Sequence, residues 1–191
     1  LREDSTSLGA LRRALGASEE AGAEVELLDL NELKLPMYEP RKPLGEYGDG
    51  VRRLVDAISG ADALLVSTAA YHGTLADVTK NALDYVQFLG KEEHPYFDGK
   101  VVGLITTAGG EQAAANANAA MVHVVHALRG IVAPLMVGVT KAWQRTDDRG
   151  NITDDNYGRR LDDLGRLVVD LAQKVGTEES SRRAEPVGAV A

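Results

Sequence analysis

Residues 61–89 read ADALLVSTAAYHGTLADVTKNALDYVQFL and contain the clearest structural pattern in the chain. The stretch opens with an apolar run over Ala61–Val66, which is typical of a strand buried on both faces. A short loop of small and polar residues, Ser67–Thr74, comes next. Apolar residues from Leu75 to Leu89 then recur at steps of three and four, which predicts an amphipathic helix. A strand, a tight loop and a helix form half of a parallel α/β unit, in which ligands bind at the loop.

The rest of the chain alternates helical and extended patterns in the same way. The helical patterns run from about residue 5 to Gly22 and over Val51–Ile58, Glu111–Arg129 and Asp154–Val175. The other strand patterns cover Ala23–Leu30, Lys100–Thr107 and Ile131–Val139. This alternation predicts an α/β domain whose mainly parallel sheet is covered on both faces. Pro134, inside the last strand, predicts an edge strand or a bulge because proline has no N–H.

The first residues, LREDSTS, lead directly into a helix pattern with Ser5, Thr6 and Ser7 at its start, where hydroxyls are good caps. In a doubly wound fold such a loop normally leaves a central strand. We therefore expect a segment of about five to ten residues, one strand in length, before Leu1.

Composition excludes several classes of function. The 191 residues carry a formal net charge of -8, which argues against a nucleic-acid-binding surface. We see no apolar stretch of membrane-spanning length and no secretory leader. Because the chain has no cysteine, disulfides, thiolate metal sites and a cysteine nucleophile are excluded, and we expect a cytoplasmic protein. We expect one domain over residues 1–175 and a disordered tail over residues 176–191.

Right-handed crossovers place the carboxyl ends of parallel strands at one edge of the sheet, where three loops should meet. Leu1–Ser7 offers hydroxyls and a helix start that suit a phosphate, although a plain helix cap is the alternative. Thr68–Thr74 carries an aromatic ring and an imidazole, and Thr107–Gly110 is nearly all backbone. Together the loops suit a ligand with a phosphate at one end and a flat ring at the other, as in a mononucleotide.

Three stretches, LREDSTS (1–7), TAAYHGTLADVTKNALDY (68–85) and TTAGG (106–110), resemble the NADPH-dependent FMN reductase family of the flavodoxin-like superfamily. The resemblance covers about residues 1–175 and implies a doubly wound sheet of five parallel strands with helices on both faces. Its most specific part is the order Tyr71, Gly73, Lys80, Asn81, Ala82, Leu83 and Asp84 after a strand.

The resemblance also implies a cofactor site. Arg2, Ser5 and Ser7 match the positions that hold the FMN phosphate in the family. The second loop of the family usually reads Pro-Glu-Tyr-Asn-Gly and flanks the ribityl chain and the ring, whereas here it reads Ala-Ala-Tyr-His-Gly. The third loop lies against the ring. The implied FMN-binding residues are Arg2, Ser5, Ser7, Thr68, Ala69, Ala70, Tyr71, His72, Gly73, Thr107, Gly109 and Gly110.

The chemistry that the resemblance implies is hydride transfer from NADPH or NADH to FMN, and then to free flavin, a quinone, an azo compound or another acceptor. The cofactor supplies this chemistry, so we assign no catalytic side chain, and we read Lys80 and Asp84 as a structural ion pair on one helix face. The chain has no GxGxxG fingerprint, so NAD(P)H should dock transiently over the flavin. Family members are commonly dimers or tetramers with the helix after the second loop at the interface, which implies a homo-oligomer.

His123 and His126 lie on one helix face without carboxylates at ligand spacing, so we predict a surface or interface pair and no metal site. Two other functions remain open at this point. The chain could be a flavodoxin-like electron carrier without pyridine-nucleotide turnover, or a non-catalytic mononucleotide-binding module.

Overall fold

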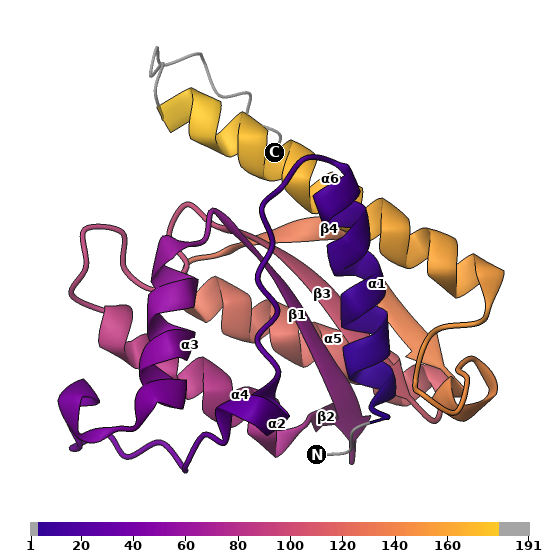
Figure 1. Cartoon of the computed structure of the whole chain (residues 1–191), viewed down its shortest axis with the longest axis horizontal. Coiled ribbons are helices and arrows are strands. Elements are labelled where there is room, and N and C mark those ends of the chain that lie inside the picture. The colour runs from indigo at the N-terminus through magenta and orange to yellow at the C-terminus, as the bar shows by residue number, and fades with distance from the viewer. Residues whose placement is uncertain (1–3, 180–191) are drawn as a thin grey trace, which may run out of the picture.

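The computed structural model describes residues 4–179, in which helices pack on both faces of a mainly parallel sheet (Figure 1). Most of the predicted elements are present, with ends shifted by a few residues. The elements are α1 (Thr6–Glu20), α2 (Leu30–Leu33), η1 (Leu44–Glu46), α3 (Asp49–Gly60), β1 (Ala63–Tyr71), β2 (Thr74–Leu75), α4 (Asp77–Asp84), η2 (Tyr85–Leu89), β3 (Val101–Ala108), α5 (Glu111–Ala127), β4 (Ile131–Thr140), η3 (Ala142–Gln144) and α6 (Asp155–Glu179).

The strands of the sheet follow the order β2-β1-β3-β4. β1, β3 and β4 are parallel, and the short β2 pairs antiparallel with the end of β1. β3 is buried along its whole length because it lies between two strands and beneath helices on both faces. The fold class is therefore the expected α/β class, with four strands in the described part of the chain instead of five.

The predicted strand Ala23–Leu30 is wrong. Residues 23–29 form no strand, and Leu30 begins the short helix α2. A groove of about 1180 Å³ separates this segment from β1, lined by Val25 and Leu28 on one side and Ala63 and Leu65 on the other. An extended segment becomes a strand only when its N–H and C=O groups meet a neighbouring strand, and this groove keeps the two apart.

β1 extends five residues beyond the apolar run, so most of the predicted loop Ser67–Thr74 is strand. β1 and β2 form a hairpin in which Tyr71 pairs with Thr74. His72 and Gly73 occupy the turn with φ of 51° and 85°. Positive φ at both central positions is typical of the tight turns that match the strand twist, and histidine adopts it more readily than most residues.

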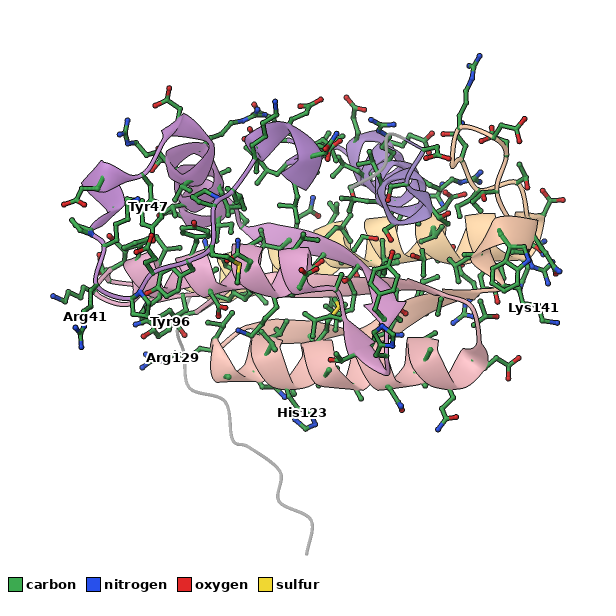
Figure 2. The ribbon with its side chains drawn as sticks, turned by 90° about the horizontal axis from the view of Figure 1, so that it is seen from below. Arg41, Tyr47, Tyr96, His123, Arg129 and Lys141 are labelled. Atoms are coloured by element: carbon green, nitrogen blue, oxygen red, sulfur yellow. The ribbon has the colours of Figure 1, made fainter. Side chains whose placement is uncertain are left out.

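Two hydrophobic cores cover the two faces of the sheet. Val101 and Ile105 of β3 pack in the core formed with α1 and α6, whereas Val102 and Leu104 pack in the core formed with α3, α4, η2 and α5. This alternation follows from the opposite directions of successive side chains in a strand. Figure 2 shows α5 along its face of the sheet, with His123 directed away from the sheet.

Pro134 is accommodated as predicted. β4 is an edge strand, and its register with β3 shifts between Val102, which faces Val132, and Leu104, which faces Met136. Two steps along β3 thus correspond to four steps along β4. The irregularity and the free edge remove the need for an N–H at the proline.

The segment over residues 31–50 is held by hydrogen bonds to the helix after β2. Asn81 is 8% exposed, accepts a hydrogen bond from the Tyr38 N–H at 2.8 Å and donates one to the Pro36 carbonyl at 2.8 Å. The Tyr85 hydroxyl donates to the same carbonyl at 2.8 Å. The burial of Tyr85 raises its pKa to about 12, so this hydroxyl stays protonated at neutral pH.

Helices α1 and α6 are joined by a two-pronged ion pair. The Arg13 guanidinium donates from Nε to Oδ1 and from Nη2 to Oδ2 of Asp162, both at 2.7 Å. The Arg13 hydrogen bond lowers the pKa of Asp162 below its ordinary value. A carboxyl group whose pKa is lower in the folded state stabilises the fold above its unfolded pKa of about 3.9, and this contribution is lost as the pH falls through the folded value.

We therefore expect the free energy of unfolding to fall more between about pH 5 and pH 3 in the wild-type protein than in Asp162→Asn. These two pH values lie roughly one unit on either side of the unfolded pKa. Urea unfolding of both proteins at the two pH values measures this difference. Asp163→Asn is the matched control, because the Asp163 side chain is 67% exposed and its carboxylate is weakly paired, at 3.9 Å from Arg166. Equal losses in the wild type and in Asp162→Asn would contradict the prediction.

Candidate functional site

The carboxyl ends of the three parallel strands are level with one another. Ala69 of β1 lies beside Thr107 of β3, which in turn lies beside Val139 of β4. In Figure 1 the strand ends lie beside the start of α1. The loops that leave β1 and β3 therefore share one edge with the start of α1, as the sequence predicts, and the segment that leaves β4 lies at the same edge.

Hydroxyl groups connect the start of α1 to this edge. The Ser7 hydroxyl lies 2.6 Å from the Thr107 hydroxyl, and Ser67 of β1 donates to the Ser7 carbonyl at 2.8 Å. Ser5 is the N-cap of α1 and its hydroxyl accepts a hydrogen bond from the Leu8 N–H at 3.4 Å. The first N–H groups of a helix have no carbonyl partner within it, and α1 has no acidic residue in its first turn, so this end favours an anion.

The second loop is the β1–β2 hairpin, whose tip projects from the sheet. Tyr71 is 61% exposed, and His72 and Gly73 are exposed as well. Thr68, by contrast, is 1% exposed, and its hydroxyl bonds to the Thr79 hydroxyl at 2.9 Å and accepts from the Ala76 N–H at 3.1 Å. Thr68 thus holds the hairpin against α4 and does not offer its hydroxyl to a ligand. Ala69 and Ala70 are half-buried in the strand.

The third loop presents bare backbone. Gly109 and Gly110 are both exposed, and no atom lies within 4 Å of the place where a side chain of Gly110 would begin. The absence of side chains lets a flat ligand approach the backbone closely. Thr107, just before the loop, is 4% exposed and reaches the start of α1 through Ser7.

A fourth segment, residues 141–153, also belongs to this edge, and the sequence reasoning did not include it. Trp143 lies against Gly109, since a methyl group on that glycine would be 3.4 Å from Cζ3 of the indole. Gly150 packs so closely on the start of α1 that a methyl group there would be 2.7 Å from the Asp4 carbonyl oxygen. The segment follows directly on a predicted strand, so the rule that placed the other loops would have placed it here too.

Asp154, which directly follows this segment, has a structural role. Asp154 accepts hydrogen bonds from the N–H groups of Asn156 and Tyr157 at 3.0 and 3.1 Å, which caps α6. Its other oxygen accepts from Arg145 at 2.6 Å. The hydrogen bond from the Tyr157 N–H lowers the pKa of Asp154, and the charge of Arg145 lowers it further, so the carboxylate is ionised at neutral pH.

The remaining predicted residues lie apart from the phosphate end of the site. Lys80 and Asp84 form the expected ion pair one turn apart on α4. His123 and His126 are exposed on α5, and the described residues contain no group of three or more side chains placed to hold a metal ion. Arg2 lies outside the described residues. Among the helices of the described part of the chain, none is long and apolar enough to span a bilayer.

An open parallel sheet with a hydroxyl-lined helix start and a bare glycine loop at its carboxyl edge defines a flavodoxin-like α/β protein. A family model for NADPH-dependent FMN reductase matches residues 1–144. The chain belongs to the NADPH-dependent FMN reductase family, and the expectation of an FMN-dependent oxidoreductase that uses NAD(P)H is confirmed at the level of the family.

Individual relatives agree with this assignment. The chain is 30% identical over 169 residues to an NAD(P)H-dependent FMN reductase of Pseudomonas aeruginosa, covering 88% of this chain and 84% of the relative. It is also 30% identical over 152 residues to an FMN-dependent NADPH-azoreductase of Staphylococcus aureus, covering 77% and 75% of the two chains. Among solved structures, the NAD(P)H:acceptor oxidoreductase FerB of Paracoccus denitrificans shares the fold, with a TM-score of 0.69, 24% identity and coverage of 91% and 93%.

Proposed function

We propose that this protein binds FMN at the carboxyl edge of the sheet and catalyses electron transfer from NAD(P)H to a small-molecule acceptor such as free flavin, a quinone or an azo compound. The single observation that carries the proposal is the 2.6 Å contact between the hydroxyls of Ser7 and Thr107, which joins the start of α1 to the glycine loop. A phosphate at α1 and a flat ring at Gly109–Gly110 fit this arrangement together.

The phosphate end of the proposed site combines fixed donors with a favourable helix end. The hydroxyls of Ser5, Ser7 and Thr107 and the first N–H groups of α1 would hold the phosphate. Arg2 is proposed as a further phosphate ligand from the family resemblance alone. Fixed hydroxyls and N–H groups suit a phosphate because they need little rearrangement to bind it.

The ring end of the proposed site is formed by backbone and one aromatic side chain. Gly109, Gly110 and the hairpin residues Ala69–Gly73 would flank the ring and the ribityl chain. When bound, FMN would supply the hydride-accepting and electron-transferring chemistry. The residues of this chain would position the cofactor, so we assign no general acid or base. NAD(P)H would dock over the open face, because the sequence has no dinucleotide fingerprint.

Replacing Tyr71 by alanine tests the ring end. We expect FMN affinity to fall severalfold or the quenching of flavin fluorescence to change, because an aromatic neighbour contributes about 0.5–1.5 kcal/mol beyond the area that it buries. Stability should change by no more than about 0.5 kcal/mol, since the side chain is 61% exposed. Tyr71→Phe keeps the ring and serves as the control. A loss of stability without any change in flavin binding would make Tyr71 a structural residue.

The function itself is tested by anaerobic titration of the purified protein with FMN and then NADPH. Bleaching of the flavin absorbance at catalytic protein concentrations is the result expected for a reductase. Binding without bleaching would favour an electron carrier instead. Failure to bind FMN would favour a module for another mononucleotide and overturn the proposal.

The finer architecture is also proposed. We propose that the complete sheet has five strands, with one further strand, parallel to β1, in the groove beside residues 23–29. The groove runs along a free edge of β1 whose residues Ala63–Ser67 are only half-buried. In the five-stranded sheet, alternate amides of β1 that face the groove should exchange slowly with deuterium. Fast exchange of the β1 amides that face the groove, together with slow exchange of the β1 amides that face β3, would contradict the five-stranded sheet.

We further propose a homodimer or homotetramer in the cytoplasm with one FMN-binding domain over residues 1–175. The support is the family resemblance and a sequence without cysteine. Light scattering of the purified protein gives the oligomeric state.

A further inference from the structure

Trp143 is a large aromatic side chain left open to solvent at the edge of the site. It is the only tryptophan in the chain and is 66% exposed. It lies on η3, directly after β4, and its six-membered ring borders Gly109 of the third loop. Its place beside Gly109, at the proposed ring end of the site, is the observation that points to contact with a flat ligand.

The backbone that carries Trp143 is firmly held. Lys141 turns the chain with a φ of 47°, and Figure 2 shows it at the opposite end of the molecule from Arg129. The Gln144 N–H donates to the Lys141 carbonyl at 2.8 Å, and the Thr146 hydroxyl donates to the Ala142 carbonyl at 3.2 Å. A left-handed residue that is not glycine costs free energy and tends to occur at functional sites.

The same segment is anchored to α6. Arg145 binds the α6 cap residue Asp154 at 2.6 Å, and the Thr153 N–H donates to the Arg145 carbonyl at 2.8 Å. Trp143 is therefore exposed on a braced turn and not on a loose loop. A surface held in place before binding loses little entropy when a ligand stacks on it.

The register of the sheet separates Trp143 from the other exposed aromatic residue of the edge. Tyr71 ends β1 and Trp143 follows β4, with Gly109 and Gly110 after the strand between them. Adjacent strands lie about 4.8 Å apart, so the two outer strands are separated by about 10 Å. The glycine loop between them lies where the FMN ring is proposed to bind, which leaves Trp143 at the rim on the β4 side.

We propose that Trp143 is a specificity residue that stacks on flat aromatic electron acceptors. The inference rests on the proposed function and adds the residue that would favour conjugated ring compounds, such as quinones, over compact ions. Offset stacking contributes about 0.5–1.5 kcal/mol beyond the buried area, which corresponds to a factor of roughly 2–10 in affinity.

The test compares Trp143→Ala with Trp143→Phe, using 1,4-naphthoquinone and ferricyanide as acceptors of the FMN-loaded enzyme. Trp143→Ala should raise the ratio of the KM for naphthoquinone to the KM for ferricyanide by about two- to tenfold. In Trp143→Phe this ratio should lie close to the wild-type value. Met37→Ala is the matched control, because Met37 is 75% exposed on a different loop. An unchanged ratio, or an equal rise in the KM for NADPH, would overturn the proposal.

A second measurement does not depend on turnover. Because the chain has one tryptophan, the indole N–H gives a single NMR resonance, which should shift when naphthoquinone is added to the FMN-loaded protein without NADPH. No shift at saturating naphthoquinone would overturn the inference, as would a loss of FMN affinity in Trp143→Ala as large as the change in KM ratio. Failure of the proposed function is distinguishable, because it appears in the unmodified protein as an absence of FMN binding.

Discussion

Replacing both Ser5 and Ser7 by alanine is expected to weaken FMN binding by about a hundredfold to about ten-thousandfold. A hydrogen bond to a charged group contributes about 1.5–3 kcal/mol, and each hydroxyl would supply one to the phosphate. Ser7 also loses its 2.6 Å contact with Thr107, which fixes the start of α1 to β3. Titration of the purified variant with FMN, followed by flavin fluorescence, measures the effect.

Riboflavin separates a phosphate effect from a general disturbance of the site. The double variant should bind riboflavin as the wild type does, because riboflavin has no phosphate. Ser5→Asp provides a second control, since aspartate retains the N-cap of α1 but repels an anion. It should fold normally and bind FMN poorly. Equal FMN affinity in the wild type and the double variant would refute the assignment of the phosphate site.

Gly165→Ala is expected to destabilise the protein by about 3 kcal/mol or more, at the upper end of the range for overpacked cores. Gly165 lies on α6 where α6 crosses α1, and a methyl group there would overlap the Ala14 carbonyl oxygen. The Gly165 carbonyl also accepts a hydrogen bond from Ser18 at 3.1 Å. Backbone cannot move aside as a flexible side chain does, so the two helices would have to separate. The midpoint of urea unfolding gives the size of the loss.

Gly16→Ala is the matched control for the glycine change. Gly16 lies in α1, and no atom lies within 4 Å of the place where its side chain would begin. Alanine is favoured over glycine in a helix by about 1 kcal/mol, so this variant should be slightly more stable than the wild type. The two glycine-to-alanine changes should therefore have opposite signs. A stabilised Gly165→Ala would disprove the close helix crossing.

Local sequence patterns predicted most of the elements, because their signals depend on neighbouring residues alone. Ser5 caps α1 as expected, and the apolar runs before Gly109 and around Pro134 became β3 and the edge strand β4. Chain order then placed the three loops at one edge, since parallel strands share a direction. The comparison with the family model agrees with the cofactor that the three short stretches had implied.

The failed predictions concern features that depend on a distant partner. Residues 23–29 have an alternating strand pattern, yet pairing needs a second strand at hydrogen-bonding distance and the groove beside β1 keeps them apart. The residues Ser67–Tyr71 lack the long apolar run of a buried strand, yet they continue β1. They do so because β3 lies alongside and pairs with β1 as far as Ala69. The final helix reaches Glu179, four residues beyond its expected end near Val175, so it continues through Gly176 and residues 176–179 of the expected tail are helical.

The start of α1, the glycine loop and the family could be predicted from short contiguous stretches, and the α/β class from the alternation of helical and extended patterns along the chain. The inward orientation of Thr68 and the contact of Trp143 with Gly109 became visible only in the packed fold. Asn81 likewise belongs to the family motif, but its contacts show that it holds residues 36 and 38. Such roles depend on which side chains meet across the fold, and residues far apart in the chain acquire them only when the strands and helices pack.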